Sequence, residues 1–200
     1  MSGRLSTTRS ATFDLVTCRY LLEQLQREIW RIKETTARQD VCDHGTNAAF
    51  TAWHMTDWAW ADFQNNWVTR SAIAKQAGHD PPNFNLPKFQ DYVAKDSEDL
   101  GICRIIATAS KHVGWNPGGT DLELTATGIA RSSGKFDATA SARSALTLPG
   151  GSTVPPESWI LKVKIDGQSH DALPIFRNAL DYWRSFIDLH QIGTPEEPRK

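Results

Sequence analysis

The chain has 200 residues, of which 40% are hydrophobic, and a formal net charge of −1. This size fits one domain and allows a sizeable core. A charge this close to zero excludes a global field toward nucleic acid or an anionic membrane, so any nucleic-acid contact requires a local basic patch. The first ten residues lack the apolar run of a signal peptide, and no apolar run approaches the length of a membrane span. We therefore expect a cytoplasmic protein with no membrane partner.

The three cysteines give the same indication about the compartment. Cys18, Cys42 and Cys103 are odd in number and widely spaced, and they form no CxxC pair. This spacing indicates neither a zinc site nor a disulfide framework. A reduced, cytoplasmic setting agrees best with it.

A long amphipathic helix is predicted over about residues 11–38. Its apolar positions alternate three and four apart, as in a heptad seam. They are Leu15, Cys18, Leu22, Leu25, Ile29 and Ile32. The seam is typical of one helix in a bundle; alternatively, part of it pairs with a second copy of the chain. The seams of the first and of the last predicted helix are each long enough to serve two neighbours, so we expect a homodimer. Residues 40–45 are predicted to be a short loop, so the first two helices are expected to be antiparallel neighbours.

Residues 46–67 form the most informative segment, a predicted second helix without internal Gly or Pro. Tryptophans recur there every seven residues, at Trp53, Trp60 and Trp67. At about 100° per residue, Asp57 falls inside this apolar arc, while His54 and Asn47 lie along its edge. Because carboxylates are rarely buried without a partner, Asp57 is expected to pair with a cation, Arg104 or Lys111. Asp62 is expected to face solvent.

Two further helices are predicted before residue 115. Residues 77–87 contain two consecutive prolines and are expected to form a loop. A short helix is predicted over 87–94, and a clear helix over about 97–112, with Asp96 or Ser97 as its cap. No helix is predicted between residue 67 and the start of the short helix at residue 87.

After residue 115 the sequence pattern changes, and apolar and polar residues alternate with a period of two. Residues 120–167 are predicted to form a small antiparallel β insert, with Leu122, Leu124 and Ala126 inward and a half-buried strand over 158–165. A last helix is predicted over about 171–191. The fold class is thus mainly α: a single domain, 1–200, with a bundle of about four long helices over 11–115 and 170–192 and the insert before the last helix.

The side chains suited to catalysis or anion binding lie along two helix edges. The second helix offers Asn47, His54 and Asp57, and the third offers Arg104, Lys111 and His112. If these edges meet, His54 or His112 can act as an acid–base group while Arg104 and Lys111 hold an anion such as phosphate. Asp57, three residues after His54, can fix the histidine tautomer. The alternative is a buried ion-pair network that only sets helix register.

The run from Arg104 to His112, RIIATASKH, resembles the motif of HEPN-type helical domains of prokaryotic toxins and defence proteins. Those domains are four-helix bundles, often dimeric, and many cleave RNA without a metal. Their motif is an Arg, an adjacent polar residue, and a His after four to six intervening residues. Here seven residues intervene and Ile105 replaces the polar residue, which places the two side chains about 80° apart on a straight helix. The resemblance implies catalytic roles for Arg104 and His112. The role of His54 is inferred from its position on the second helix and not from the resemblance.

The sequence therefore favours a metal-independent endoribonuclease of toxin or phage-defence type, with RNA as a partner and no cofactor. The expected catalytic residues are His112, Arg104 and His54, and the expected substrate-binding residues are Lys111, Asp57 and Asn47. A metal centre of His54, His112, His170 and Asp57 is a third reading, but the sequence has neither HExxH nor a Glu-x-x-His pair. The alternative function is a non-enzymatic α-helical interaction module or complex subunit, for which eight tryptophans would supply contact surface.

Overall fold

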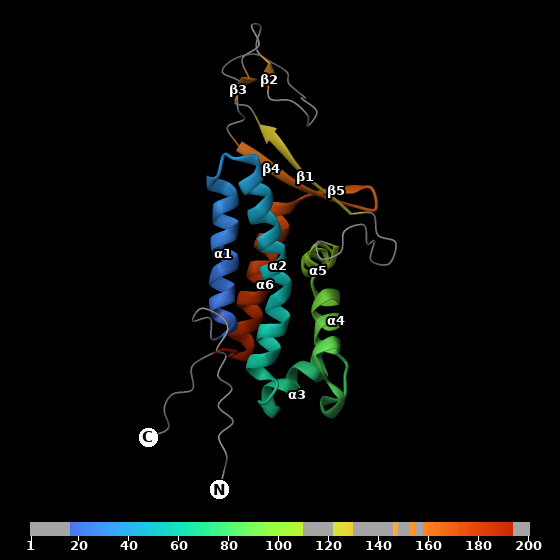
Figure 1. Ribbon diagram of the computed structural model, residues 1–200. Helices are drawn as coiled ribbons and strands as arrows, with labels where there is room; N and C mark the ends of the chain where they lie inside the picture. Colours follow the sequence, from blue (N-terminus) through green and yellow to red (C-terminus); the bar gives the residue numbers. More distant parts are fainter. Residues whose placement is uncertain (1–16, 110–121, 130–145, 148–152, 155–157, 194–200) are drawn as a thin grey trace, which may run out of the picture.

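The structure, a computed structural model, describes residues 17–109, 122–129, 146–147, 153–154 and 158–193 (Figure 1). It is mainly helical, with a small antiparallel sheet before the last helix, which confirms the predicted fold class. The described helices are α1 (Cys18–Glu34), α2 (Arg38–Phe63), α3 (Trp67–Gln76), α4 (Leu86–Asp96), α5 (Glu98–Ala109) and α6 (Ala172–His190), with a 3-10 turn at Pro81–Asn83. The strands are β1 (Leu122–Ile129), β2 (Leu146–Thr147), β3 (Thr153–Val154), β4 (Ser158–Ile165) and β5 (Gln168–Asp171).

The bundle is built around α2, which lies between α1 and α6 on one side and α4 and α5 on the other (Figure 1). Trp183 of α6 is fully buried, and its indole Nε1 donates to the carbonyl of Ala52 on α2 at 2.9 Å. This bond satisfies the one polar atom of a large apolar side chain, as buried tryptophans generally require. Edge-to-face packing between Phe63 and Phe89, with ring centroids 5.1 Å apart, continues the core toward α4.

The loop predicted at residues 40–45 is wrong, because these residues belong to α2. The chain turns instead at residues 35–37, and α2 begins at Arg38 with Asp40 in its first turn, where a carboxylate suits the helix dipole. Gly45 therefore lies inside a helix, at a cost of about 1 kcal/mol relative to alanine. A Cβ at this position would meet Cδ1 of Leu161 on β4. Close packing between helix and strand explains the glycine better than a turn does.

Asp62 was expected to face solvent, and this expectation is also wrong. Its Oδ2 accepts a hydrogen bond from the backbone N–H of Cys18 at 2.8 Å. The carboxylate thus caps the first turn of α1, where the side chain of Thr17 makes no capping hydrogen bond. Arg19 donates to the carbonyl of Ile192 at 3.1 Å, so the start of α1 is also held by the segment after α6.

Helix α3 was missed by the sequence analysis. Asn66 caps it by accepting from the Thr69 N–H at 3.2 Å, but its apolar residues do not form one clear stripe. Trp67 and Val68 at its start are 55% and 77% exposed. Trp67 therefore does not belong to the apolar arc of Trp53 and Trp60, because α2 ends before it.

The sheet has the order β1–β4–β5, all antiparallel, and lies across one end of the bundle (Figure 1). Ala126 and Val163 are buried in this sheet. The indole N–H of Trp159 donates to the carbonyl of Thr36 at 2.7 Å, and this bond connects β4 to the turn between α1 and α2. Leu124 was predicted to face inward but is 45% exposed. The strand at 158–165 and the helix after it agree with the predictions. A short β2–β3 ladder forms a second sheet. None of the described helices is long and apolar enough to cross a membrane.

Candidate functional site

A group of polar side chains lies where α2, α4 and α5 meet. We name it the junction cluster and define it by five residues from the three helices. They are His54 and Asp57 of α2, Gln90 and Asp91 of α4, and Arg104 of α5.

His54 and Asp57 form a hydrogen-bonded pair at this junction. The distance between His54 Nδ1 and Asp57 Oδ2 is 3.2 Å, and each side chain is 42% exposed. Gln90 donates from its amide to the other carboxylate oxygen of Asp57 at 3.1 Å and to the hydroxyl of Thr56 at 3.3 Å. Because a carboxylate only accepts hydrogen bonds, Nδ1 of the neutral imidazole carries the proton and Nε2 is its basic nitrogen. The tautomer-fixing contact expected from the i, i+3 spacing is present.

Arg104 belongs to a neighbouring set of contacts. Its guanidinium donates to Oδ1 of Asp91 at 2.9 Å and lies over the Trp53 ring, 5.3 Å from the ring centroid. Arg104 is thus held by a carboxylate at one side and an aromatic face at another, while 44% of its side chain stays exposed.

The expected burial of Asp57 and its pairing with Arg104 are therefore wrong. Helix α4 lies beside α2 at this point and leaves Asp57 half exposed, so its carboxylate keeps contact with water. The hydrogen-bonding needs of Asp57 are met by His54 and Gln90. The sequence argument placed α5 directly opposite this edge because it did not anticipate how α4 would pack.

The two sets of contacts adjoin each other. Trp53 and His54 are consecutive on α2, and Gln90 and Asp91 are consecutive on α4. The two sets thus occupy consecutive positions on α2 and on α4, which point about 100° apart on each helix. The arrangement provides an oriented imidazole and a cation, each about half exposed, at one helix junction.

The remaining predicted site residues are not part of this arrangement. Lys111 and His112 lie outside the described residues, as does the C-terminal end of the predicted third helix. Asn47 is exposed and lies about two turns before His54 on α2. His170 is in β5, opposite Val163, and so belongs to none of the three helices that form the junction cluster. Among the described residues no group of three or more His, Cys, Asp and Glu side chains is placed to hold a metal ion.

Gln90 and Asp91 were missed by the sequence analysis. The predicted helix over residues 87–94 has Phe89 and Val93 on its inner face, and both are fully buried. At about 100° per residue, residue 90 lies about 80° from the middle of that face, whereas residue 91 lies on the opposite side of the helix. The spacing thus marks Gln90 as a flank position and gives no signal for Asp91, and the partner of each side chain depended on the packing of three helices.

A second polar cluster lies between α1 and α2. The carboxylate of Glu28 is buried, and it accepts hydrogen bonds from Arg31 at 2.6 Å and from Nδ1 of His44 at 2.7 Å. Its charge is therefore compensated within the helix pair, as buried carboxylates require. Neither Glu28 nor His44 was singled out in the sequence, and His44 fell in the loop that was wrongly predicted over residues 40–45.

The remaining titratable groups with displaced pKa values are poor catalysts as they stand. Burial, aided by the nearby Asp96 carboxylate, raises the pKa of Tyr92 to about 12. Burial also raises the pKa of Tyr182, whose hydroxyl donates to Asp96 at 3.0 Å, and the pKa of the Cys103 thiol. Burial lowers the pKa of His190. The phenols and the thiol therefore keep their protons at neutral pH.

Comparison with known proteins gives a plain result. No family model, no curated protein and no solved structure matches the chain. The case for a function therefore rests on the geometry of the junction cluster and on the surfaces around it.

Proposed function

We propose that the protein is a metal-independent endoribonuclease that acts in the cytoplasm in a toxin or defence role, with the junction cluster as its site. The observation that supports this proposal is the half-exposed His54–Asp57 pair, with Arg104 in contact with Trp53, the residue that precedes His54 on α2. RNA cleavage without a metal requires a base for the 2′-hydroxyl and a cation for the phosphate, and this cluster offers both residue types.

The roles follow from the hydrogen bonds. Asp57 holds the proton on Nδ1 of His54, so that Nε2 takes the proton of the attacking 2′-hydroxyl. Attack of the 2′-oxygen on the phosphorus forms a 2′,3′-cyclic phosphate and breaks the bond to the 5′-oxygen of the next nucleotide, which takes a proton from water. The imidazolium of His54 then returns its proton to the solvent. Arg104 binds the phosphate oxygens while charge develops on them.

Arg104 must exchange Asp91 for a phosphate in this scheme. Both partners of the present ion pair are about half exposed, at 44% and 56%. Such pairs contribute only about 0–1 kcal/mol, so the exchange costs little. Removal of the Asp91 charge by Asp91→Asn should therefore lower the KM for RNA several-fold and leave kcat nearly unchanged.

The central test is cleavage of mixed single-stranded and structured RNA by the pure protein in EDTA. We expect cleavage in wild type and a loss of about 10²–10⁴-fold in His54→Gln, the range for removal of a general base. The matched control is His170→Gln, which changes a half-buried histidine in the sheet and should keep activity. Substrate with 2′-deoxyribose at the cleavage positions should resist.

Several results would contradict the proposal. They are the absence of cleavage by the folded wild-type protein, equal activity in His54→Gln and wild type, and cleavage of the deoxy-substituted strand. A requirement for added divalent ions would instead point to a metal-dependent reaction. Circular dichroism and a melting curve for each variant separate a chemical loss from unfolding.

A second candidate function is a non-enzymatic interaction module, dimeric or part of a complex. The observation that favours it is the exposed start of α3, where Trp67 and Val68 face solvent and the guanidinium of Arg70 lies 5.2 Å from the Trp67 ring centroid. Tryptophan and arginine are enriched among the side chains that dominate binding energy at interfaces. Light scattering of wild type and of the double variant Trp67→Ala, Val68→Ser tests it: a dimer mass in the first and a monomer mass in the second would support it.

A further inference from the structure

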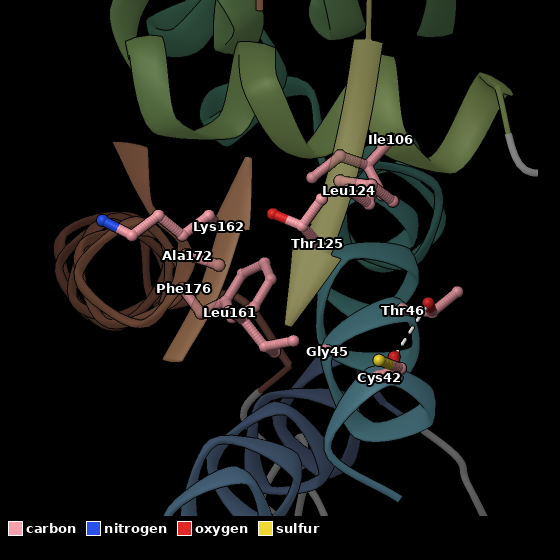
Figure 2. Close-up of a pocket in the computed structure, with 10 residues that line it drawn as sticks. All are labelled: Cys42, Gly45, Thr46, Ile106, Leu124, Thr125, Leu161, Lys162, Ala172 and Phe176. Carbon is pink, nitrogen blue, oxygen red and sulfur yellow. Dashed lines mark hydrogen bonds between the residues drawn. The ribbon is translucent and has the colours of Figure 1, made fainter. Parts of the chain in front are cut away.

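The described residues leave a cavity of about 110 Å³, partly open to solvent, where the sheet packs on the bundle. Five elements contribute to its wall: α2, α5, α6, β1 and β4. The lining residues are Cys42, Gly45, Thr46, Ile106, Leu124, Thr125, Leu161, Lys162, Ala172 and Phe176, and Figure 2 shows them around the space. We propose that this cavity is a binding site for a small uncharged apolar molecule of about six carbon atoms.

The polar groups of the wall are largely occupied by partners within the protein. Lys162 pairs with Asp171 at 3.0 Å, and its ammonium end points away from the other lining residues (Figure 2). The hydroxyl of Thr46 donates to the carbonyl of Cys42 at 3.0 Å. A charged ligand would lose its hydration here without gaining a free counter-charge, whereas an apolar ligand loses little. The wall therefore selects for uncharged apolar chemistry.

The size of the cavity sets the size of the ligand. An engineered protein cavity of about 150 Å³ lined by Leu, Ile and Phe stays dry and binds benzene. The present cavity is somewhat smaller, at about 110 Å³, and is partly open to solvent, while Ile106, Leu161 and Phe176 give it the same kind of apolar wall. A six-carbon ring or a short branched chain matches this space, whereas only one ring of a two-ring molecule would fit inside it.

The position of the cavity gives binding a consequence for the fold. Gly45 lets β4 approach α2 so closely that Leu161 contacts the helix backbone, and the cavity opens beside this contact. A ligand there would touch helices and strands at once and would add apolar contact between the two layers. Binding should therefore stabilise the attachment of the sheet to the bundle, independently of any RNA cleavage.

The test uses the full chain and benzene as the probe. At ten times its dissociation constant, a ligand of the folded state should raise the melting temperature by about 3–6 °C for a chain of this size. In methyl NMR spectra, Ile106 and Leu161 should shift on addition of benzene. The methyl groups of Ile73 in α3 and Val93 in α4 should not.

Two variants locate the site. Ala172→Leu adds bulk at a 2% exposed position of the wall and should abolish the benzene-induced shifts. Thr125→Val keeps the shape of the wall and removes its hydroxyl, so it should keep them. Ala72→Leu, at an exposed position of α3, is the matched control for added bulk and should behave as wild type.

The outcomes decide the proposal in either direction. An unchanged melting temperature and unshifted Ile106 and Leu161 methyl signals in benzene would overturn it. Undiminished benzene shifts in a folded Ala172→Leu would overturn the location. If Ala172→Leu does not fold, naphthalene replaces it as the size test: binding of naphthalene as tight as that of benzene would contradict a cavity of this volume.

Discussion

Glu28 offers a direct test of how the first helical pair is held together. The residue is 4% exposed, and its carboxylate accepts one hydrogen bond from Arg31 on α1 and one from His44 on α2. Replacement by alanine removes both bonds and the buried charge. Replacement by glutamine keeps the shape of the side chain and removes only the charge, so the two variants separate packing from electrostatics.

The expected loss in the free energy of unfolding depends on the two hydrogen bonds of Glu28 and on how exposed Arg31 and His44 are. A hydrogen bond to a charged group contributes about 1.5–3 kcal/mol, which gives about 3–6 kcal/mol for two such bonds. The side chains of Arg31 and His44 are 46% and 25% exposed, so both regain water contact when Glu28 is lost. We therefore expect a value near the lower end, about 3 kcal/mol for Glu28→Ala, and about half of it for Glu28→Gln.

Urea and thermal denaturation measure this loss. About 3 kcal/mol corresponds to a decrease in melting temperature of about 6–12 °C for a chain of this size. The matched control is Glu23→Ala on the same helix, whose partner Arg27 lies 3.8 Å away and whose side chain is 65% exposed. Such a surface pair should contribute about 0–1 kcal/mol. Equal melting temperatures for Glu28→Ala and Glu23→Ala would refute the argument that the buried carboxylate stabilises the helix pair.

Three further predictions concern single positions. Gly45→Ala should lower stability by about 1 kcal/mol in urea denaturation, because overpacking against Leu161 outweighs the better helix propensity. Asp62→Ala should lower the melting temperature by about 2–4 °C, because the Cys18 N–H loses its cap. Tyr92→Phe should remove an ionisation near pH 12 from the phenolate absorbance titration. Since the Tyr92 pKa is raised from 10 to about 12, its contribution to stability is present below pH 10 and lost as pH rises through 12.

Each of these predictions has an internal control. The double variant Gly45→Ala, Leu161→Ala removes the contacted side chain, so adding the alanine at 45 should no longer destabilise. For the cap, Asp188→Ala changes an exposed carboxylate paired with Arg19 and should change the melting temperature by less than Asp62→Ala does. An Asp62→Ala variant as stable as wild type would show that the cap contributes nothing. A Tyr92→Phe titration that superimposes on that of wild type after scaling would contradict the assignment.

The elements with strong periodicity could be predicted from the sequence, and those defined by contact could not. The alternation at Leu180, Trp183 and Ile187 predicted α6 because it reports one face against the core, and all three are buried. The same reasoning failed at Gly45. Glycine is a turn signal in isolation, but there it serves the approach of a strand whose position no local pattern reveals.

The candidate site shows the same division. The pairing of His54 with Asp57 follows from positions three apart on one helix, so it could be predicted. The partner of Arg104 could not, because it depended on the location of α4, a helix whose existence was expected but whose packing was not. Asp91 therefore took the place that had been assigned to Asp57.

The hydrogen bond from Arg19, at the start of α1, to the carbonyl of Ile192 has a consequence for how the chain folds. Arg19 and Ile192 are 173 positions apart, and closing a loop of that length costs about 4.6 kcal/mol by the logarithmic term alone. Helices α1 and α2, joined by a short turn, can associate early as local neighbours. At that stage the N-terminal end of α1 can already bond to Asp62 of α2. Its second bond, from Arg19 to Ile192, forms only after α6 has docked, so the slowest step of folding should be the arrival of the final helix.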